Sequence, residues 1–204
     1  MTMKVVMFGC GFLASHILPH ILPFCDQLIL IDRERIEQVN YENGLLLKDY
    51  IGKFKTTNLA MLAKLLSNIP VAVYQDDLKG DILNLIGPNE PDTIGILTFD
   101  NPESRLLVKE NFNFPIINVG VTENYFNILW LENMDDEYFT DPAIKQSMAR
   151  IKDVCERKEF RSLGMLASSY AFHFFYLYLT THRKYGCVAT LDQDRLHTIR
   201  TEDE

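Results

Sequence analysis

The chain has 204 residues, which suits one domain of ordinary size or a domain with a short appendage. Hydrophobic residues make up 47% and charged residues 24%, so disordered and fibrous classes are excluded. The formal net charge is −8, and the sequence has no basic stripe of the kind that a nucleic-acid-binding surface needs. No stretch approaches the roughly 18 apolar residues of a membrane span, and the N-terminus lacks the pattern of a secretory signal. We therefore expect a cytoplasmic protein with no membrane partner, and nucleic acid is a disfavoured ligand.

Short apolar runs alternate with helical patterns, which indicates buried parallel strands flanked by helices. The predicted strands cover residues 4–8, 28–31, 71–74, 93–97, 116–119 and 126–131. The predicted helices cover residues 12–22, 53–66, 81–86 and 102–111. Pro19 is expected to kink or shorten the first helix, and a long loop separates the second strand from the second helix. This order predicts an α/β fold with a Rossmann-like, doubly wound, mainly parallel sheet.

The character of the sequence changes after residue 131. Residues 135–158 are polar and irregular, which predicts a short helix and a mobile crossover, and residues 160–179 predict a largely buried helix. Residues 185–190 and 196–200 predict a C-terminal antiparallel hairpin. We expect one domain over residues 1–204, made of a nucleotide-binding core (1–131), a crossover (132–160) and a late helix with a hairpin (161–204).

A glycine-rich turn, G-x-G-x-x-A, lies between the first predicted strand and helix, with Gly9 and Gly11 as its glycines. Glycines allow a tight turn and let backbone N–H groups reach a phosphate at the helix N-terminus. The N–H groups expected there are those of Gly11, Phe12 and Leu13. Asp32 ends the second strand, where a carboxylate can accept hydrogen bonds from ribose hydroxyls. These features predict an adenine nucleotide and leave the choice between NAD and ATP open.

Beyond the second strand the chain resembles the ThiF/MoeB/HesA family, ATP-dependent activators related to the ubiquitin-activating enzymes. The family pattern reads G-x-G-(G/x)-x-(G/A), D-x-D-x-V-x-x-S-N-L-N-R-Q, G-x-x-K and D-N-x-x-x-R. The matching residues are Gly9, Gly11, Ala14, Asp32, Asn40, Asn43, Gly52, Lys55, Asp100, Asn101 and Arg105. Residues 115–130 and 163–169 resemble later parts of the family, so the likeness covers nearly the whole chain in the right order. The ordered set, rather than any one element, makes the resemblance specific.

The resemblance implies an adenylyltransferase that uses ATP and Mg²⁺. The C-terminal carboxylate of a small ubiquitin-like or sulfur-carrier protein, or of a peptide, attacks the α-phosphate and gives an acyl-adenylate and pyrophosphate. The implied catalytic residues are Lys55 on the phosphates, Asp100 on Mg²⁺, Asn43 near the reaction centre, and Arg105, which packs against the loop or assists the nucleotide. The implied cofactor-binding residues are Gly9, Gly11, Phe12, Leu13, Asp32, Asn40, Lys55 and Asn101. A homodimer, or a heterodimer with a ThiF-like partner, is also implied.

The chain departs from the family pattern at three points. Gly44 stands where an arginine is expected, and the candidates to replace that cation are Arg33, Arg35 or an arginine from a partner subunit. Glu34 replaces the second acid of D-x-D, and the zinc-binding CxxC pairs are absent, so no zinc site is expected. Gly44 motivates an alternative, an inactive subunit that scaffolds an active partner. A less favoured alternative is an NAD-binding oxidoreductase, which only the glycine turn and Asp32 support.

Further cysteine and histidine side chains are candidates for a nucleophile or a metal ligand. Cys155 is a candidate nucleophile in the crossover, where nearby cations would favour a thiolate, and an incidental thiol is the alternative. His16 and His20 are one helical turn apart but have no third ligand, so no metal site is expected. His173 is expected in the core or at an interface. The remaining cysteines, Cys10, Cys25 and Cys187, are expected in the core. The aromatic residues of the late helix predict core packing plus a dimer interface.

Overall fold

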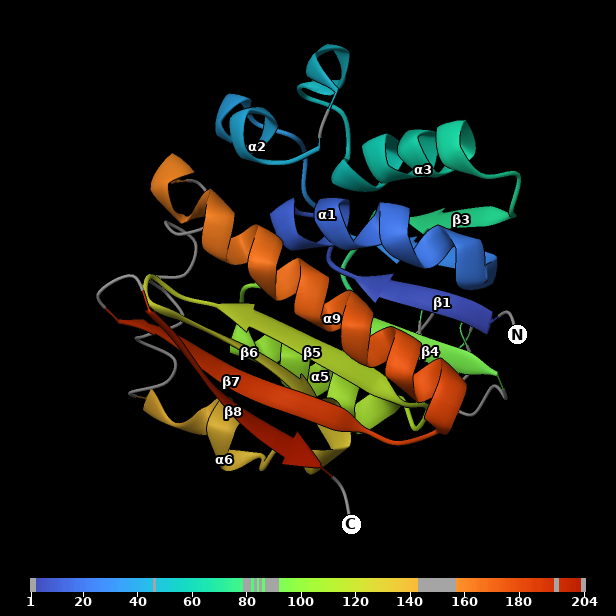
Figure 1. The fold of residues 1–204 in the computed structure, drawn as a ribbon. Helices are drawn as coiled ribbons and strands as arrows, with labels where there is room; N and C mark the ends of the chain where they lie inside the picture. The colour runs from blue at the N-terminus through green and yellow to red at the C-terminus, as the bar shows by residue number, and fades with distance from the viewer. Residues whose placement is uncertain are drawn as a thin grey trace.

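The computed structural model describes residues 3–45, 47–78, 82, 84, 86, 92–142, 157–192 and 195–202. Its strands are β1 (Met3–Phe8), β2 (Cys25–Ile31), β3 (Val71–Tyr74), β4 (Thr93–Leu97), β5 (Ile116–Val121), β6 (Tyr125–Trp130), β7 (Tyr185–Asp192) and β8 (Arg195–Glu202). They form one eight-stranded sheet in the order β3-β2-β1-β4-β5-β6-β7-β8 (Figure 1). The pairs from β3 to β5 are parallel, and β6, β7 and β8 continue the sheet in antiparallel fashion. The predicted α/β class and its antiparallel C-terminal extension are confirmed.

Helices cover both faces of this sheet (Figure 1). The described helices are α1 (Phe12–Ile21), α2 (Gln38–Asn43), α3 (Lys55–Leu66), α5 (Pro102–Asn111), α6 (Glu137–Thr140) and α9 (Arg161–Thr181). Short 3-10 turns cover Leu22–Phe24, Lys48–Tyr50, Leu131–Asn133 and Lys158–Phe160. Apolar side chains of α1, α3 and α9 share one core with the sheet, and those of α5 and α6 share a second core on the opposite face. The sheet is therefore doubly wound.

Most predicted elements lie where the apolar runs placed them. The predicted bounds of β3, β4 and α5 agree with the structure at both ends. Helix α1 continues past Pro19 and ends at Ile21, one residue before its predicted end. Of the helix predicted at 81–86, only residues 82, 84 and 86 are described, and all three are helical. The hairpin of β7 and β8 is confirmed, with residues 193 and 194 of its turn outside the described part.

Helix α9 differs from the prediction of a largely buried helix. One side, including Gly164, Ala167 and Phe175, is buried against α1 and the sheet. The other side carries Tyr176 at 42% exposure and an exposed His173, so the expectation of a core histidine is wrong. The helix is buried on one side only, because α1 and the sheet cover that side. The interface role of this outer side and the single-domain assignment stay predictions.

Within the described ranges, no helix is both long and apolar enough to cross a membrane.

Candidate functional site

The sheet changes its winding direction between β1 and β4. The chain leaves β1 toward α1 on one face and leaves β4 toward α5 on the other, which is where doubly wound sheets bind ligands. An open pocket of about 260 Å³ lies there, between the segments that follow β1, β2, β3 and β4. The predicted site residues that line it are Gly9, Gly11, Phe12, Leu13, Asp32, Asn40, Lys55, Asp100 and Asn101. Residues far apart in the sequence therefore meet at the carboxyl ends of the parallel strands.

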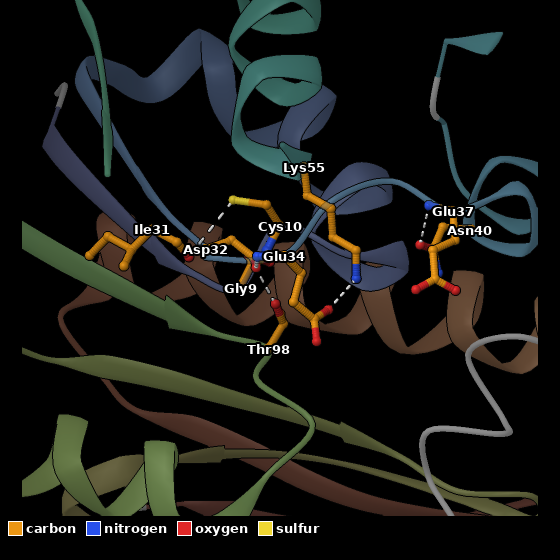
Figure 2. A network of polar contacts seen from close by, with 9 residues as sticks. All are labelled: Gly9, Cys10, Ile31, Asp32, Glu34, Glu37, Asn40, Lys55 and Thr98. Atoms are coloured by element: carbon orange, nitrogen blue, oxygen red, sulfur yellow. Dashed lines mark hydrogen bonds and ion pairs between the residues drawn. The ribbon is translucent and has the colours of Figure 1, made fainter. Parts of the chain in front are cut away.

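The glycine turn needs its glycines for two different reasons. Gly9 has a φ of +97°, and a Cβ atom there would lie 2.7 Å from Thr98 Oγ1 and 3.0 Å from the Thr98 carbonyl carbon. Thr98 Oγ1 donates to the Gly9 carbonyl at 3.2 Å, which joins the loops after β1 and β4 (Figure 2). A Cβ atom on Gly11, by contrast, would meet open space at the N-terminus of α1. The pocket therefore has room for a ligand group beside the N–H groups of this helix, as phosphate binding requires.

Asp32 ties the glycine turn to the end of β2. Its Oδ2 atom accepts a hydrogen bond from the Cys10 N–H at 2.7 Å, and its Oδ1 atom accepts one from the Glu34 N–H at 2.8 Å. Burial raises the pKa of Asp32, while the charge of Lys55 and these two hydrogen bonds lower it, and the net shift is upward. Each carboxylate oxygen can accept a further bond, so ribose binding by Asp32 stays a prediction that this geometry permits.

Lys55 is the first residue of α3, and its ammonium group lies among carboxylates. Its Nζ atom donates to Glu34 Oε2 at 2.5 Å (Figure 2). Burial alone would lower the pKa of Lys55, but Asp32, Glu34 and Asp100 together raise it above its ordinary value. The side chain is therefore a cation that lines the pocket, paired with Glu34.

Helix α2 follows β2 and begins with a reciprocal cap. The Glu37 N–H donates to Asn40 Oδ1 at 2.9 Å, and the Glu37 side chain accepts from the Asn40 N–H. Asn40 thus both lines the pocket and fixes the start of the helix. Asn43 is the last residue of α2, and its side chain lies outside the described part, as does Cys155. Their predicted roles remain predictions.

The loop after β4 carries Asp100 and is anchored from behind. Asn101 caps α5 by accepting from the Ser104 N–H at 2.8 Å. Arg105 is 2% exposed and donates to the Phe99 carbonyl at 2.7 Å, to Asn118 Oδ1 at 2.6 Å and to the Val119 carbonyl at 3.1 Å. It is absent from the pocket lining. Of the two roles considered for Arg105, the geometry matches packing against the loop, so Arg105 is a positioning residue.

Several contacts in the site were not predicted from the sequence. Glu34 is the direct partner of Lys55, Thr98 closes the turn at Gly9, and Asn118 holds Arg105. Asn118 did give a signal, because an amide inside an apolar strand must find a partner when it is buried. Thr98 gave none, and Glu34 was noted only as the second acid of D-x-D, since the partners of both residues are far away in the sequence.

The pocket suits a magnesium ion that arrives with phosphates. Mg²⁺ is usually held by one or two carboxylates together with substrate phosphates, and Asp100 lines the pocket near Lys55. In the part of the chain that the structure covers, no group of three or more His, Cys, Asp or Glu side chains could hold a metal alone. His16 packs against Phe12, with ring centroids 4.9 Å apart, and His20 packs against Phe172 at 5.4 Å, so each lies against a different aromatic ring.

The described cysteines are buried, as predicted for Cys10, Cys25 and Cys187. Burial raises the pKa of the Cys10 thiol well above its ordinary value, and it raises the pKa of Cys25 to about 12. Neither thiol is therefore a thiolate nucleophile at neutral pH.

Comparison with known proteins found likeness in structure alone. No protein-family model matches the chain, and no curated protein matches its sequence. Among solved structures, E. coli MccB with ATP superposes with a TM-score of 0.71 at 20% identity, over 98% of this chain and 64% of MccB. The microcin C7 biosynthetic enzyme MccB in complex with N-formylated MccA gives 0.69 at 19% identity, over 98% of this chain and 65% of that one. PaaA gives 0.68 at 19% identity, over 97% of this chain and 72% of PaaA. The chain thus has the MccB fold and spans about 64% of the length of MccB.

Proposed function

We propose that the chain is an ATP-dependent adenylyltransferase that activates the C-terminal carboxylate of a peptide or small protein as an acyl-adenylate. The observation that carries the proposal is the meeting of the glycine turn, Asp32, Lys55 and Asp100 in one pocket at the switch point of the sheet. MccB, which has the same fold, has been solved with ATP and with MccA, which supports a nucleotide and a peptide as ligands.

In the proposed reaction, each group in the pocket has a part. The N–H groups at the start of α1 would bind a phosphate, and Asp32 would accept hydrogen bonds from the ribose. Lys55 would exchange Glu34 for phosphate oxygens as a compact cation. An oxygen of the substrate carboxylate attacks the α-phosphorus, and the bond to the bridging oxygen breaks with its electron pair leaving on pyrophosphate. Mg²⁺ held by Asp100 would neutralise the charge that grows on this leaving group.

The alternatives explain fewer of these residues. An NAD-binding oxidoreductase accounts for the glycine turn and Asp32 but gives Lys55 and Asp100 no task in the same pocket. A scaffolding subunit without activity rests on Gly44 alone. The dimer, the cytoplasmic location and the identity of the carboxylate substrate stay predictions.

Two measurements test the proposed function. Calorimetric titration of the purified chain should show binding of Mg-ATP that is tighter than binding of NAD, and tight NAD binding without Mg-ATP binding would contradict the proposal. Exchange of labelled pyrophosphate into ATP should appear with peptides that carry a free C-terminal carboxylate and disappear with the same peptides amidated at the C-terminus.

Asp100→Ala should lower this exchange by about 100-fold or more, since a group that stabilises transition-state charge is lost. Glu103→Ala is the matched control. It changes an exposed side chain in the first turn of α5 and should leave the pyrophosphate exchange unchanged. Unchanged exchange in Asp100→Ala would remove Asp100 from the mechanism.

A further inference from the structure

Three basic side chains from the described residues line the pocket, and they differ in their partners. Lys55 is bound to Glu34, and Arg33 forms an ion pair with Asp77. Arg35 forms no ion pair with any carboxylate that the structure describes. Since the pocket is otherwise rich in acids, an arginine that none of them neutralises is the group most available to an added anion.

The backbone holds Arg35 directly beside the start of α3. Arg35 forms an isolated antiparallel bridge with Phe54, the residue before Lys55. Two hydrogen bonds secure this bridge, from the Ile36 N–H to the Lys53 carbonyl at 2.8 Å and from the Lys55 N–H to the Glu34 carbonyl at 2.9 Å. Arg35 and Lys55 therefore flank the same short bridge, at the N-terminus of a twelve-residue helix. The positive end of that helix adds to the attraction for anions.

The guanidinium group of Arg35 is held in place without using up its donors. Its Cζ atom lies 4.0 Å from the centroid of the Phe54 ring, and one terminal nitrogen donates to the Gly52 carbonyl at 2.9 Å. The remaining N–H donors of the planar fork stay available for a phosphate. A cation that is already oriented loses little conformational entropy when it binds a ligand.

Arg33 lacks these features. Its side chain is exposed, as that of Arg35 is, but its charge is matched by Asp77, which follows β3. The ion pair with Asp77 raises the pKa of Arg33. An added phosphate would have to compete with this carboxylate, whereas at Arg35 it would not.

We propose that Arg35 is a specificity-determining residue that binds the β- and γ-phosphates of ATP together with Lys55, so that the pocket selects a triphosphate over AMP or NAD. This inference rests on the proposed function, because it assumes that ATP is the nucleotide. The α-phosphate belongs near the glycine turn and the start of α1, which leaves the outer phosphates to the cations at the start of α3. Arg35 then supplies, beside Lys55, a cation for these outer phosphates at the start of α3.

The test compares the binding of Mg-ATP and of AMP, measured by calorimetry, in the unmodified chain, Arg35→Gln and Arg33→Gln. Arg35→Gln should weaken Mg-ATP binding by about tenfold or more and leave AMP binding within about twofold, since AMP lacks the outer phosphates. Arg33→Gln should not change the ratio of the two affinities. An equal loss for both nucleotides in Arg35→Gln, or a selective loss of ATP binding in Arg33→Gln, would overturn the assignment.

One further variant keeps the result interpretable. Arg35→Lys retains the charge and should keep part of the preference for ATP, even if Arg35→Gln folds poorly. If the chain binds ATP with these ratios but forms no acyl-adenylate, only the proposed function fails. If the unmodified chain binds neither nucleotide, both proposals fail.

Discussion

At the scale of single residues, the Asp32 carboxylate joins two of the loops that line the pocket. Asp32 accepts hydrogen bonds from N–H groups of both loops and is 7% exposed. These hydrogen bonds and the charge of Lys55 stabilise its charged form, whereas burial destabilises it. Its pKa is raised in the folded chain, so ionised Asp32 costs stability once the pH exceeds its ordinary pKa. This cost is complete above the folded-state pKa and vanishes as the pH falls to the ordinary value.

Lys55→Met should therefore raise the pKa of Asp32 further, because it removes the nearest positive charge. At neutral pH the free energy of unfolding should fall by about 1–3 kcal/mol, and the loss should shrink as the pH falls through the pKa of Asp32. Carbon NMR of the aspartate carboxyl groups gives the pKa, with Asp32→Asn identifying the signal, and urea unfolding gives the free energy. A lower Asp32 pKa in Lys55→Met would contradict this account.

Which residues face the pocket was easier to predict than what each residue does there. Gly9, Asp32 and Lys55 face the pocket as expected, because their places at strand and helix ends follow from the apolar pattern around them. Arg105 lies behind the loop, and two of its partners, Asn118 and Val119, come from β5, which no local pattern connects to α5. Which side an arginine takes depends on carbonyl and amide groups that only the fold brings together.

At the scale of elements, the contact of α9 with α1 shapes one wall of the pocket. A Cβ atom on Gly164 would lie 2.0 Å from Phe12 Cε1, and Phe12 both begins α1 and lines the pocket. Ser168, one turn later, donates to the Leu13 carbonyl at 3.3 Å. The late helix therefore supports the start of α1, although it does not line the pocket itself.

Gly164→Ala should push the Phe12 ring out of place. The expected cost is about 1–3 kcal/mol of stability, as for other overpacked sites, together with weaker Mg-ATP binding. Met165→Ala, on the exposed side of the same helix, is the control and should change neither quantity. The double variant Gly164→Ala/Phe12→Leu should regain stability, as measured by thermal unfolding. If it does not, contact with the Phe12 ring is not the source of the strain.

Helix α2 could not be predicted from the pattern of apolar residues. Residues 38–43 are mostly polar and have no apolar periodicity, so the sequence predicted a loop there. The helix forms because Glu37 and Asn40 cap each other, a local arrangement that gives little signal by itself. The strands and the longer helices were predictable because burial on the sheet imposes apolar runs on them.

For the whole molecule, the order of elements was enough to predict the doubly wound sheet and the location of its site. The parallel strands from β3 to β5 and the switch between β1 and β4 follow from alternating strands and helices. The way the late helix divides into a buried and an exposed side could not be predicted, because its aromatic residues occur on both sides. That division depends on how much of the helix the sheet covers.

Because the pocket joins the segments after four strands, a bound nucleotide should stabilise the chain as a unit. A ligand at about 100 times its dissociation constant adds roughly 2.7 kcal/mol, which for a chain of this size raises Tm by about 5–10 °C. Scanning calorimetry should show this rise with Mg-ATP, a smaller one with AMP at the same concentration, and almost none with Mg-ATP in Asp32→Asn. A larger rise with NAD than with Mg-ATP would show that the pocket serves a dinucleotide, since stabilisation at equal concentration follows affinity for the folded chain.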